Sequence, residues 1–140
     1  KPEDRIWEAS DPKELQNLIT GKYQGDDAQQ YRRVIRALKR WKDLRFSAHG
    51  RKAPKGIALT VAAYHWFYVS KNVSQFDDLA ALRNLVASMR NQFQSVWSQA
   101  TQKYVPRLQI RLPIGSYADL CDNMSEASMQ NLKDELDRLA

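Results

Sequence analysis

The chain has 140 residues, of which 43% are hydrophobic and 27% are charged, a balance that favours one folded domain over a disordered segment. One cysteine and two histidines exclude an internal disulfide framework, and a zinc site with the usual number of ligands is not expected. No long apolar run and no signal-like segment after Lys1 are found, so we expect a cytoplasmic protein without a membrane partner.

The net charge of +6 is concentrated in one part of the chain. Between Arg32 and Lys55, ten basic residues are opposed only by Asp43, so this stretch carries +9 and the rest carries −3. A block of this kind attracts polyanions such as nucleotides or nucleic acid. A solvated helix face is the alternative explanation.

Two helices are predicted at the start of the chain. Asp11 is a candidate N-cap, Pro12 suits the first helical position and Glu14 completes a capping box, so a helix is expected from there to Gly21. Gly25, Asp26 and Asp27 precede a second helix over residues 28–44. Its apolar stripe consists of Tyr31, Val34, Ile35, Leu38 and Trp41.

Basic residues occupy the opposite side of the second helix. Arg32, Arg36 and Lys39 follow i, i+4, i+7 spacing and form a column, with Arg40 beside them. Like charges in a column repel one another, so an anion held between them is a reason for the arrangement. Trp41 is assigned to the core.

A basic loop over residues 47–54 leads into an apolar run from Ile57 to Val69. Its length and its alanines favour a buried helix at the centre of a bundle. Lys55 and Gly56 stand at the start of this helix, where free N–H groups and the helix dipole favour anions. His65, inside the run, is expected to be a hydrogen-bonded core residue.

The second half of the chain predicts two more helices and one extended segment. A helix is expected from Asp77 and Asp78 to about Lys103, and a last one after Ser125. Between them, residues 105–114 alternate apolar and basic side chains, with Leu108, Ile110 and Leu112 inward and Arg107 and Arg111 outward. Cys121 is assigned no nucleophilic role. The expected fold is a mainly α single domain over 1–140, a bundle of about five helices around a buried central helix.

Two motifs of this sequence resemble a known enzyme superfamily. The string Ile35-Arg36-x-x-Lys39-x-Trp41 is followed by Pro54-Lys55-Gly56-Ile57. This pairing resembles the C-terminal helical lobe of the oligoadenylate synthetase and cyclic GMP-AMP synthase superfamily, and most of all the bacterial CD-NTases of CBASS anti-phage systems. Further similar positions are Trp7, Ser10-Asp11-Pro12, Leu112-Pro113, Asp119-Leu120 and Met124-Ser125.

The resemblance implies a nucleotidyltransferase that joins nucleoside triphosphates such as ATP or GTP into a cyclic second messenger. In that family an N-terminal lobe carries a Gly-Ser motif and three carboxylates that hold Mg²⁺. This chain has no Gly-Ser followed by D-x-D, and its Asp26-Asp27 and Asp77-Asp78 pairs are explained by capping. The catalytic lobe, its partner, is therefore expected to be missing, and the segment alone is expected to be inactive.

The resemblance also implies which residues bind the nucleotide. Arg36 and Lys39 match the positions that reach the phosphates, and Arg32 extends the same column. Lys55, Gly56 and Ile57 match the segment that contacts base or ribose; Gly56-Ile57 departs from the polar or aromatic residue found in relatives, which leaves a backbone contact.

Two other functions remain open on the sequence. The first is a basic, all-helical nucleic-acid-binding module in which the +9 stretch follows a phosphate backbone. The second is a bundle that binds only other proteins, through a surface that a partner lobe would cover.

Overall fold

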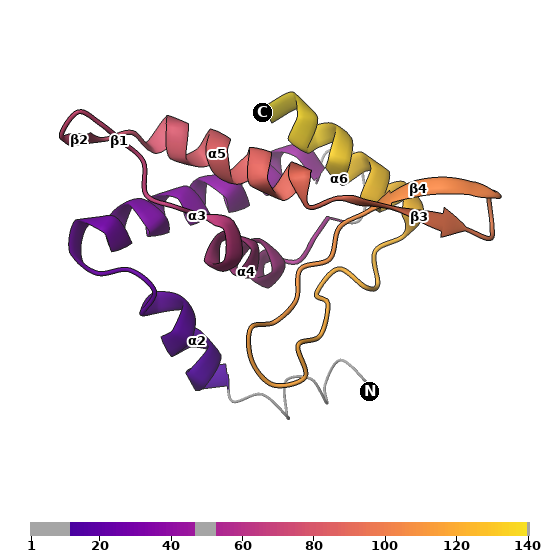
Figure 1. Ribbon diagram of the computed structural model, residues 1–140, viewed down its shortest axis with the longest axis horizontal. Helices are drawn as coiled ribbons and strands as arrows, with labels where there is room; N and C mark the ends of the chain where they lie inside the picture. Colours follow the sequence, from indigo (N-terminus) through magenta and orange to yellow (C-terminus); the bar gives the residue numbers. More distant parts are fainter. Residues whose placement is uncertain (1–11, 47–52, 140) are drawn as a thin grey trace.

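The computed structural model describes residues 12–46 and 53–139, which are mostly helical with a few short strands. The helices are α2 (Pro12–Thr20), α3 (Gly25–Phe46), α4 (Gly56–Trp66), α5 (Asp78–Asn91) and α6 (Glu126–Leu139) (Figure 1). Two antiparallel hairpins join them, β1–β2 (Lys71–Asn72 and Gln75–Phe76) and β3–β4 (Gln94–Ser98 and Lys103–Arg107). None of these helices is long and apolar enough to cross a bilayer. The expected Asp11 cap and residues 47–52 of the basic loop lie outside the described residues.

Helix α4 is the buried element that the apolar run predicts. It packs against α3 and α5 and, over a smaller contact, against α2 (Figure 1). Five of its side chains are completely buried: Ala58, Leu59, Val61, Ala62 and Ala63. Small alanine side chains let neighbouring helices approach closely while keeping the interior dense. The helix ends at Trp66, three residues before the end of the apolar run.

Helix α3 has the two faces that its sequence predicts. Tyr31, Val34 and Leu38 are buried, and Trp41 is half-buried against the core, with its ring 5.8 Å from that of Phe46. Phe46 closes the helix inside the core. The basic residues are therefore left on the flank and on the solvent side of the same helix.

The long helix expected from residue 77 to about 103 is wrong in its second half. Helix α5 begins where predicted, with the Asp77 carboxylate accepting a hydrogen bond from the Ala80 N–H at 3.0 Å, but it ends at Asn91. The next residues form the β3–β4 hairpin, in which Trp97 pairs with Tyr104. β-Branched and aromatic residues on both strands favour this pairing over a helix. The hairpin projects from the helical body (Figure 1).

The segment after β4 is extended, and its alternation is confirmed. Leu108, Ile110 and Leu112 are all buried. The expected outward direction of Arg107 is wrong: it is half-buried, and its guanidinium donates hydrogen bonds to the backbone carbonyls of Cys121, Asp122 and Met124. Arg111 is exposed, as expected.

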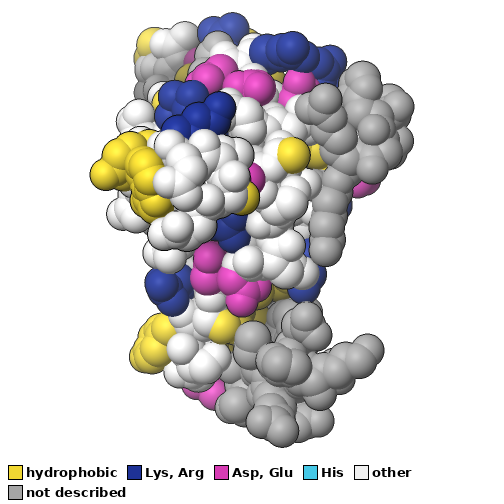
Figure 2. Space-filling view, turned by 90° about the vertical axis from the view of Figure 1, so that its right-hand side faces the viewer, with side chains coloured by type: hydrophobic (Ala, Val, Ile, Leu, Met, Phe, Trp, Pro, Cys, Tyr) yellow, Lys and Arg dark blue, Asp and Glu magenta, His cyan; other side chains and the backbone are white. Residues whose placement is uncertain are grey.

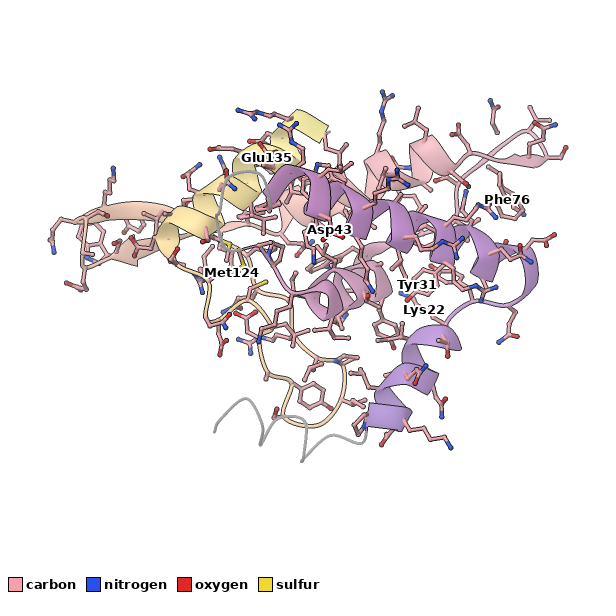
Figure 3. The ribbon with its side chains drawn as sticks, turned by 180° about the vertical axis from the view of Figure 1, so that it is seen from behind. Lys22, Tyr31, Asp43, Phe76, Met124 and Glu135 are labelled. Atoms are coloured by element: carbon pink, nitrogen blue, oxygen red, sulfur yellow. The ribbon has the colours of Figure 1, made fainter. Side chains whose placement is uncertain are left out.

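Helix α6 starts at the predicted cap and closes the core. The Ser125 hydroxyl accepts a hydrogen bond from the Ser128 N–H at 3.1 Å, and Met129, Leu132 and Leu136 are buried. Glu135 is also buried and faces the end of α3, where it pairs with Arg45 (Figure 3). This ion pair therefore joins α3 to α6.

Candidate functional site

A cleft of about 410 Å³ lies where α2 passes the start of α4. Its wall on α2 includes Leu15 and Ile19, and α3 contributes Lys39. Helix α4 contributes Gly56, Ile57 and Thr60. We name it the α2–α4 cleft. Most of its surface is apolar, and none of the lining residues in the described ranges 12–46 and 53–139 is acidic.

Buried side chains of α2 and contacts just beyond its C-terminal end hold this helix beside α4. Leu15 and Ile19, one turn apart, are buried against the core. After the helix, the Lys22 ammonium donates a hydrogen bond to the Tyr64 carbonyl and lies 4.8 Å from the centre of the Tyr64 ring. The Lys22 ammonium also lies 5.8 Å from the centre of the Tyr23 ring, which packs against Tyr31 of α3 with ring centres 5.0 Å apart. Desolvation at this junction lowers the pKa of Lys22.

Two residues at the start of α4 that line the cleft have unused backbone donors. Lys55 is the N-cap, with extended φ and ψ angles of −65° and 149° and no side-chain cap hydrogen bond. Its carbonyl accepts from the N–H groups of Ala58 and Leu59. Among the described residues, the N–H groups of Gly56 and Ile57 have no acceptor. Free N–H groups at the positive end of a helix dipole are favourable for an anion.

Lys39 brings a full positive charge to the same place. A Cβ atom added at Gly56 would lie 3.8 Å from Lys39 Cε, which shows how closely the lysine side chain passes the start of α4. Lys39 is half-buried and lines the cleft. The fold therefore brings the predicted nucleotide-binding residue Lys39 to Gly56 and Ile57, two predicted residues that belong to the next helix.

The other three predicted residues do not line this cleft. Arg32 and Arg36 are exposed on α3, and Lys55 is exposed just before α4. Because an α-helix turns about 100° per residue, Arg32 and Arg36 lie within about 60° of Lys39 around the helix axis. The predicted column therefore exists, but only its last member enters the cleft.

Three arginines of α3 form a charged line on the solvent side of this helix. We name Arg32, Arg36 and Arg40 the arginine stripe. All three are exposed, and none forms an ion pair with another described residue. Arg33 differs, since its Nε lies 2.7 Å from an Asp78 carboxylate oxygen. The face of the molecule in Figure 2 is different again, with acidic and basic side chains interspersed.

Two assignments made for single residues need correction. His65 is exposed, not part of the core, although it does form a hydrogen bond, with Nε2 2.6 Å from the Arg111 carbonyl oxygen. Asp78 is not a cap: its carboxylate accepts hydrogen bonds from Arg33 and Gln30. The Arg33 hydrogen bond is the main cause that lowers the pKa of Asp78.

Within the described part of the chain, the carboxylates form no metal-holding cluster and the cysteine thiol is protonated. No group of three His, Cys, Asp or Glu side chains that could hold a metal ion occurs in residues 12–46 and 53–139. Cys121 is buried, and desolvation raises the pKa of its thiol to about 12. A thiol in this state is a poor nucleophile.

The contribution of α2 to the cleft was missed by sequence reasoning. In the sequence, Leu15, Leu18 and Ile19 form the apolar side of this helix, which predicts a buried face without saying what it faces. The contact between α2 and α4 bridges more than thirty residues of chain, and spacing within one helix carries no information about such a contact.

No protein-family model, curated protein or solved structure matches this chain.

Proposed function

We propose that the chain is the nucleotide-binding helical lobe of a nucleotidyltransferase that makes a cyclic second messenger in anti-phage defence. It binds nucleoside triphosphates in the α2–α4 cleft, in the cytoplasm. Carboxylates of a separate N-terminal lobe hold Mg²⁺ and perform the transfer. The observation that supports this proposal is the position of Lys39 beside the open start of α4, within a cleft whose surface is mostly apolar.

The charged end of the cleft suits a phosphate group. Lysine is a compact point charge on a flexible stem, so it can follow a phosphate oxygen. The N–H groups of Gly56 and Ile57 add donors that are already oriented, at a helix end that favours negative charge. Among the described residues, no acidic side chain lines the cleft to oppose a triphosphate.

The apolar part of the cleft suits a ribose and a base. Leu15, Ile19 and Ile57 offer a surface on which a planar ring is removed from water. The Thr60 hydroxyl donates to the Gly56 carbonyl at 3.2 Å. Its oxygen lone pairs remain free to accept a hydrogen bond from a ribose hydroxyl.

The role of this lobe is to bind and orient the nucleotide, not to make the new bond. Holding a triphosphate in line with an attacking hydroxyl lowers the barrier by removing freedom of motion. We expect the purified chain to have no synthetase activity with Mg²⁺ and nucleoside triphosphates. Product formation by the chain alone would contradict the proposed division of labour.

The proposal is tested by removing the charge of Lys39 while keeping its length. We expect Lys39→Met to weaken ATP and GTP binding by about tenfold or more, the effect of losing one charge-assisted hydrogen bond. The measurement is isothermal titration calorimetry on the full chain. Lys103→Met, on the exposed hairpin strand, is the matched control and is expected to bind as the unaltered chain does. Equal affinities for the Lys39 and Lys103 variants would refute the site.

The arginine stripe supports a second candidate function, a nucleic-acid-binding module. Its three exposed residues, at i, i+4 and i+8, present a row of charges that can follow a phosphate backbone. This function predicts affinity that grows with oligonucleotide length and falls steeply with salt. The variant R32Q/R36Q/R40Q would flatten the salt dependence, whereas triphosphate binding in the cleft would change little.

A further inference from the structure

We propose that a second cleft, at the opposite end of α4, binds a single nucleotide unit, with its base among carboxamide and aromatic side chains and its phosphate on Arg111. The cleft has a volume of about 260 Å³. We name it the α4–β3 cleft. The residues that line it come from four parts of the chain: His65, Trp66, Gln92, Gln94, Gln109 and Arg111.

The α4–β3 cleft is distinct from the α2–α4 cleft. The α4–β3 cleft is lined by the last two residues of α4, whereas the α2–α4 cleft is lined by residues of its first turns. The two share no lining residue. Binding in one therefore requires none of the contacts that define the other, and this inference stands apart from the proposed function.

Arg111 supplies an oriented positive charge without a negative partner. Its Nη1 donates to the Tyr117 carbonyl at 3.2 Å, and its Nη2 donates to Gln109 Oε1 at 3.3 Å. Both acceptors are neutral, and Arg111 forms no ion pair within the described part of the chain. A guanidinium has five N–H groups, so donors remain free. A planar fork of this kind matches the oxygens of a phosphate.

His65 is oriented by the backbone of Arg111. A carbonyl oxygen can only accept, so the 2.6 Å contact requires that Nε2 of His65 carries the proton. In the neutral ring Nδ1 is then an acceptor. The ring centres of His65 and Trp66 are 5.8 Å apart. Two neighbouring aromatic rings offer faces on which a base can stack.

The three glutamines give the cleft its selectivity for a base. A carboxamide combines donors and an acceptor, the pattern that pairs with the N6 and N7 edge of adenine. The volume lies below the roughly 300–1,000 Å³ of pockets that enclose a drug-sized ligand. It therefore admits one heterocycle, with the charged part of the ligand at the exposed Arg111.

The test uses adenosine 5′-monophosphate and the ¹H–¹⁵N spectrum of the full chain. We expect saturable shifts of the indole N–H of Trp66 and of the carboxamide N–H groups of Gln92, Gln94 and Gln109. Inorganic phosphate or adenosine alone should bind about tenfold or more weakly, because each makes only part of the contacts. Absence of these shifts, or equal binding of phosphate alone, would overturn the proposal.

Variants separate this cleft from the rest of the molecule. Arg111→Gln should weaken the nucleotide about tenfold or more, while Arg83→Gln, an exposed arginine on α5, should change nothing. Gln92→Leu provides a second variant if Arg111→Gln does not fold, and it should also weaken binding. Full affinity in a folded Arg111→Gln or Gln92→Leu protein would refute the assigned contacts.

An oligoadenylate series and the Lys39→Met variant provide two further measurements. Affinity that rises with the length of an oligoadenylate identifies the ligand as one nucleotide of a single strand. Affinity that is the same for the oligoadenylate and for adenosine 5′-monophosphate identifies a free mononucleotide. Both results agree with a site for one adenine base and one phosphate. Lys39→Met should leave the shifts at Trp66 unchanged. If Lys39→Met loses ATP binding and the Trp66 signal does not shift with adenosine 5′-monophosphate in any variant, the proposed function stands and this inference fails. If the Trp66 signal shifts but Lys39→Met binds ATP as the unaltered chain does, this inference stands and the proposed function fails.

Discussion

At the scale of single residues, two glycines at the starts of helices have opposite backbone requirements. Gly25 has a φ of +60°, and a Cβ atom added there would meet nothing within 4 Å. A Cβ atom added at Gly56 would touch only the flexible Lys39 side chain, at 3.8 Å. We therefore expect Gly25→Ala to lower the free energy of unfolding by about 1–2 kcal/mol through backbone strain.

Gly56→Ala is the matched control for that substitution. It should leave the free energy of unfolding unchanged or raise it by up to about 1 kcal/mol, because alanine restricts the unfolded chain. Urea denaturation followed by circular dichroism measures both variants. Equal effects of the two would contradict the left-handed conformation at Gly25.

Asp78 predicts a pH dependence of stability. Hydrogen bonds from Arg33 and Gln30 lower its pKa in the folded state, while the unfolded chain has a value of about 3.9. The stabilisation is therefore complete above that value and is lost as the pH falls through the lower folded-state pKa. Asp78→Asn removes this titration.

The urea midpoints of the unaltered chain and of Asp78→Asn are compared at two pH values. The difference should be larger at about pH 6 than at about pH 2.5. Both side chains are partly exposed, so solvent screening keeps the effect modest. A difference that does not change with pH would show that the Arg33–Asp78 pair makes no contribution to stability.

At the scale of elements, Glu135 connects α6 to α3. Its buried carboxylate lies 2.5 Å from Arg45 Nε and 2.8 Å from Arg138 Nη1. We expect Glu135→Gln to lower the free energy of unfolding by about 1–2 kcal/mol, less than for a fully buried pair, because both arginines keep contact with water.

Asp137→Asn is the control for the α6 charge pairs. Asp137 lies on the exposed side of α6 and pairs with Arg90 of α5. An exposed pair is worth roughly 0–1 kcal/mol, so this variant should unfold close to the unaltered chain in the same urea experiment. If both variants lost the same stability, burial would not distinguish the two pairs.

The elements also show what could be predicted from the sequence. The apolar stripe of α3, the cap of α6 and the buried α4 follow from local periodicity, and the structure confirms all three. The β3–β4 hairpin was missed because Phe93 and Val96 continue the helical spacing of α5, whereas the less exposed positions of β3 are Val96 and the polar Ser98. The strand is stabilised by hydrogen bonds from β4, and the residues of β3 alone do not show that such a partner is present.

At the scale of the whole molecule, the candidate site could be predicted only in part. The spacing within α3 correctly placed Lys39 on the side of the basic column, and the start of α4 was located to the residue. That α2 covers this end, while Arg36 remains outside the cleft, depends on how three helices pack together. His65 was misplaced for the same reason, because an apolar run does not show where its last turn emerges from the core.

The separation of the two clefts leads to a prediction for the whole chain. The effects of Lys39→Met and Arg111→Gln on the free energy of unfolding should add within about 0.3–0.5 kcal/mol, as for residues that share no partners. Urea denaturation of the two single variants and the double variant measures this. A larger deviation would show that α4 transmits a change from one of its ends to the other.

The stretch between β4 and α6 contains no helix and only one isolated antiparallel bridge, between Arg111 and Asp119, yet hydrogen bonds tie its backbone together. The Asp119 carboxylate accepts from the N–H groups of Ile110 and Cys121, and the Leu120 N–H donates to the Ile110 carbonyl. An engineer who shortened this stretch, or placed an epitope tag in it, would disturb the interior. The β1–β2 turn is the permissive position for such an insertion, because Val73 at its tip is 97% exposed and packs on nothing.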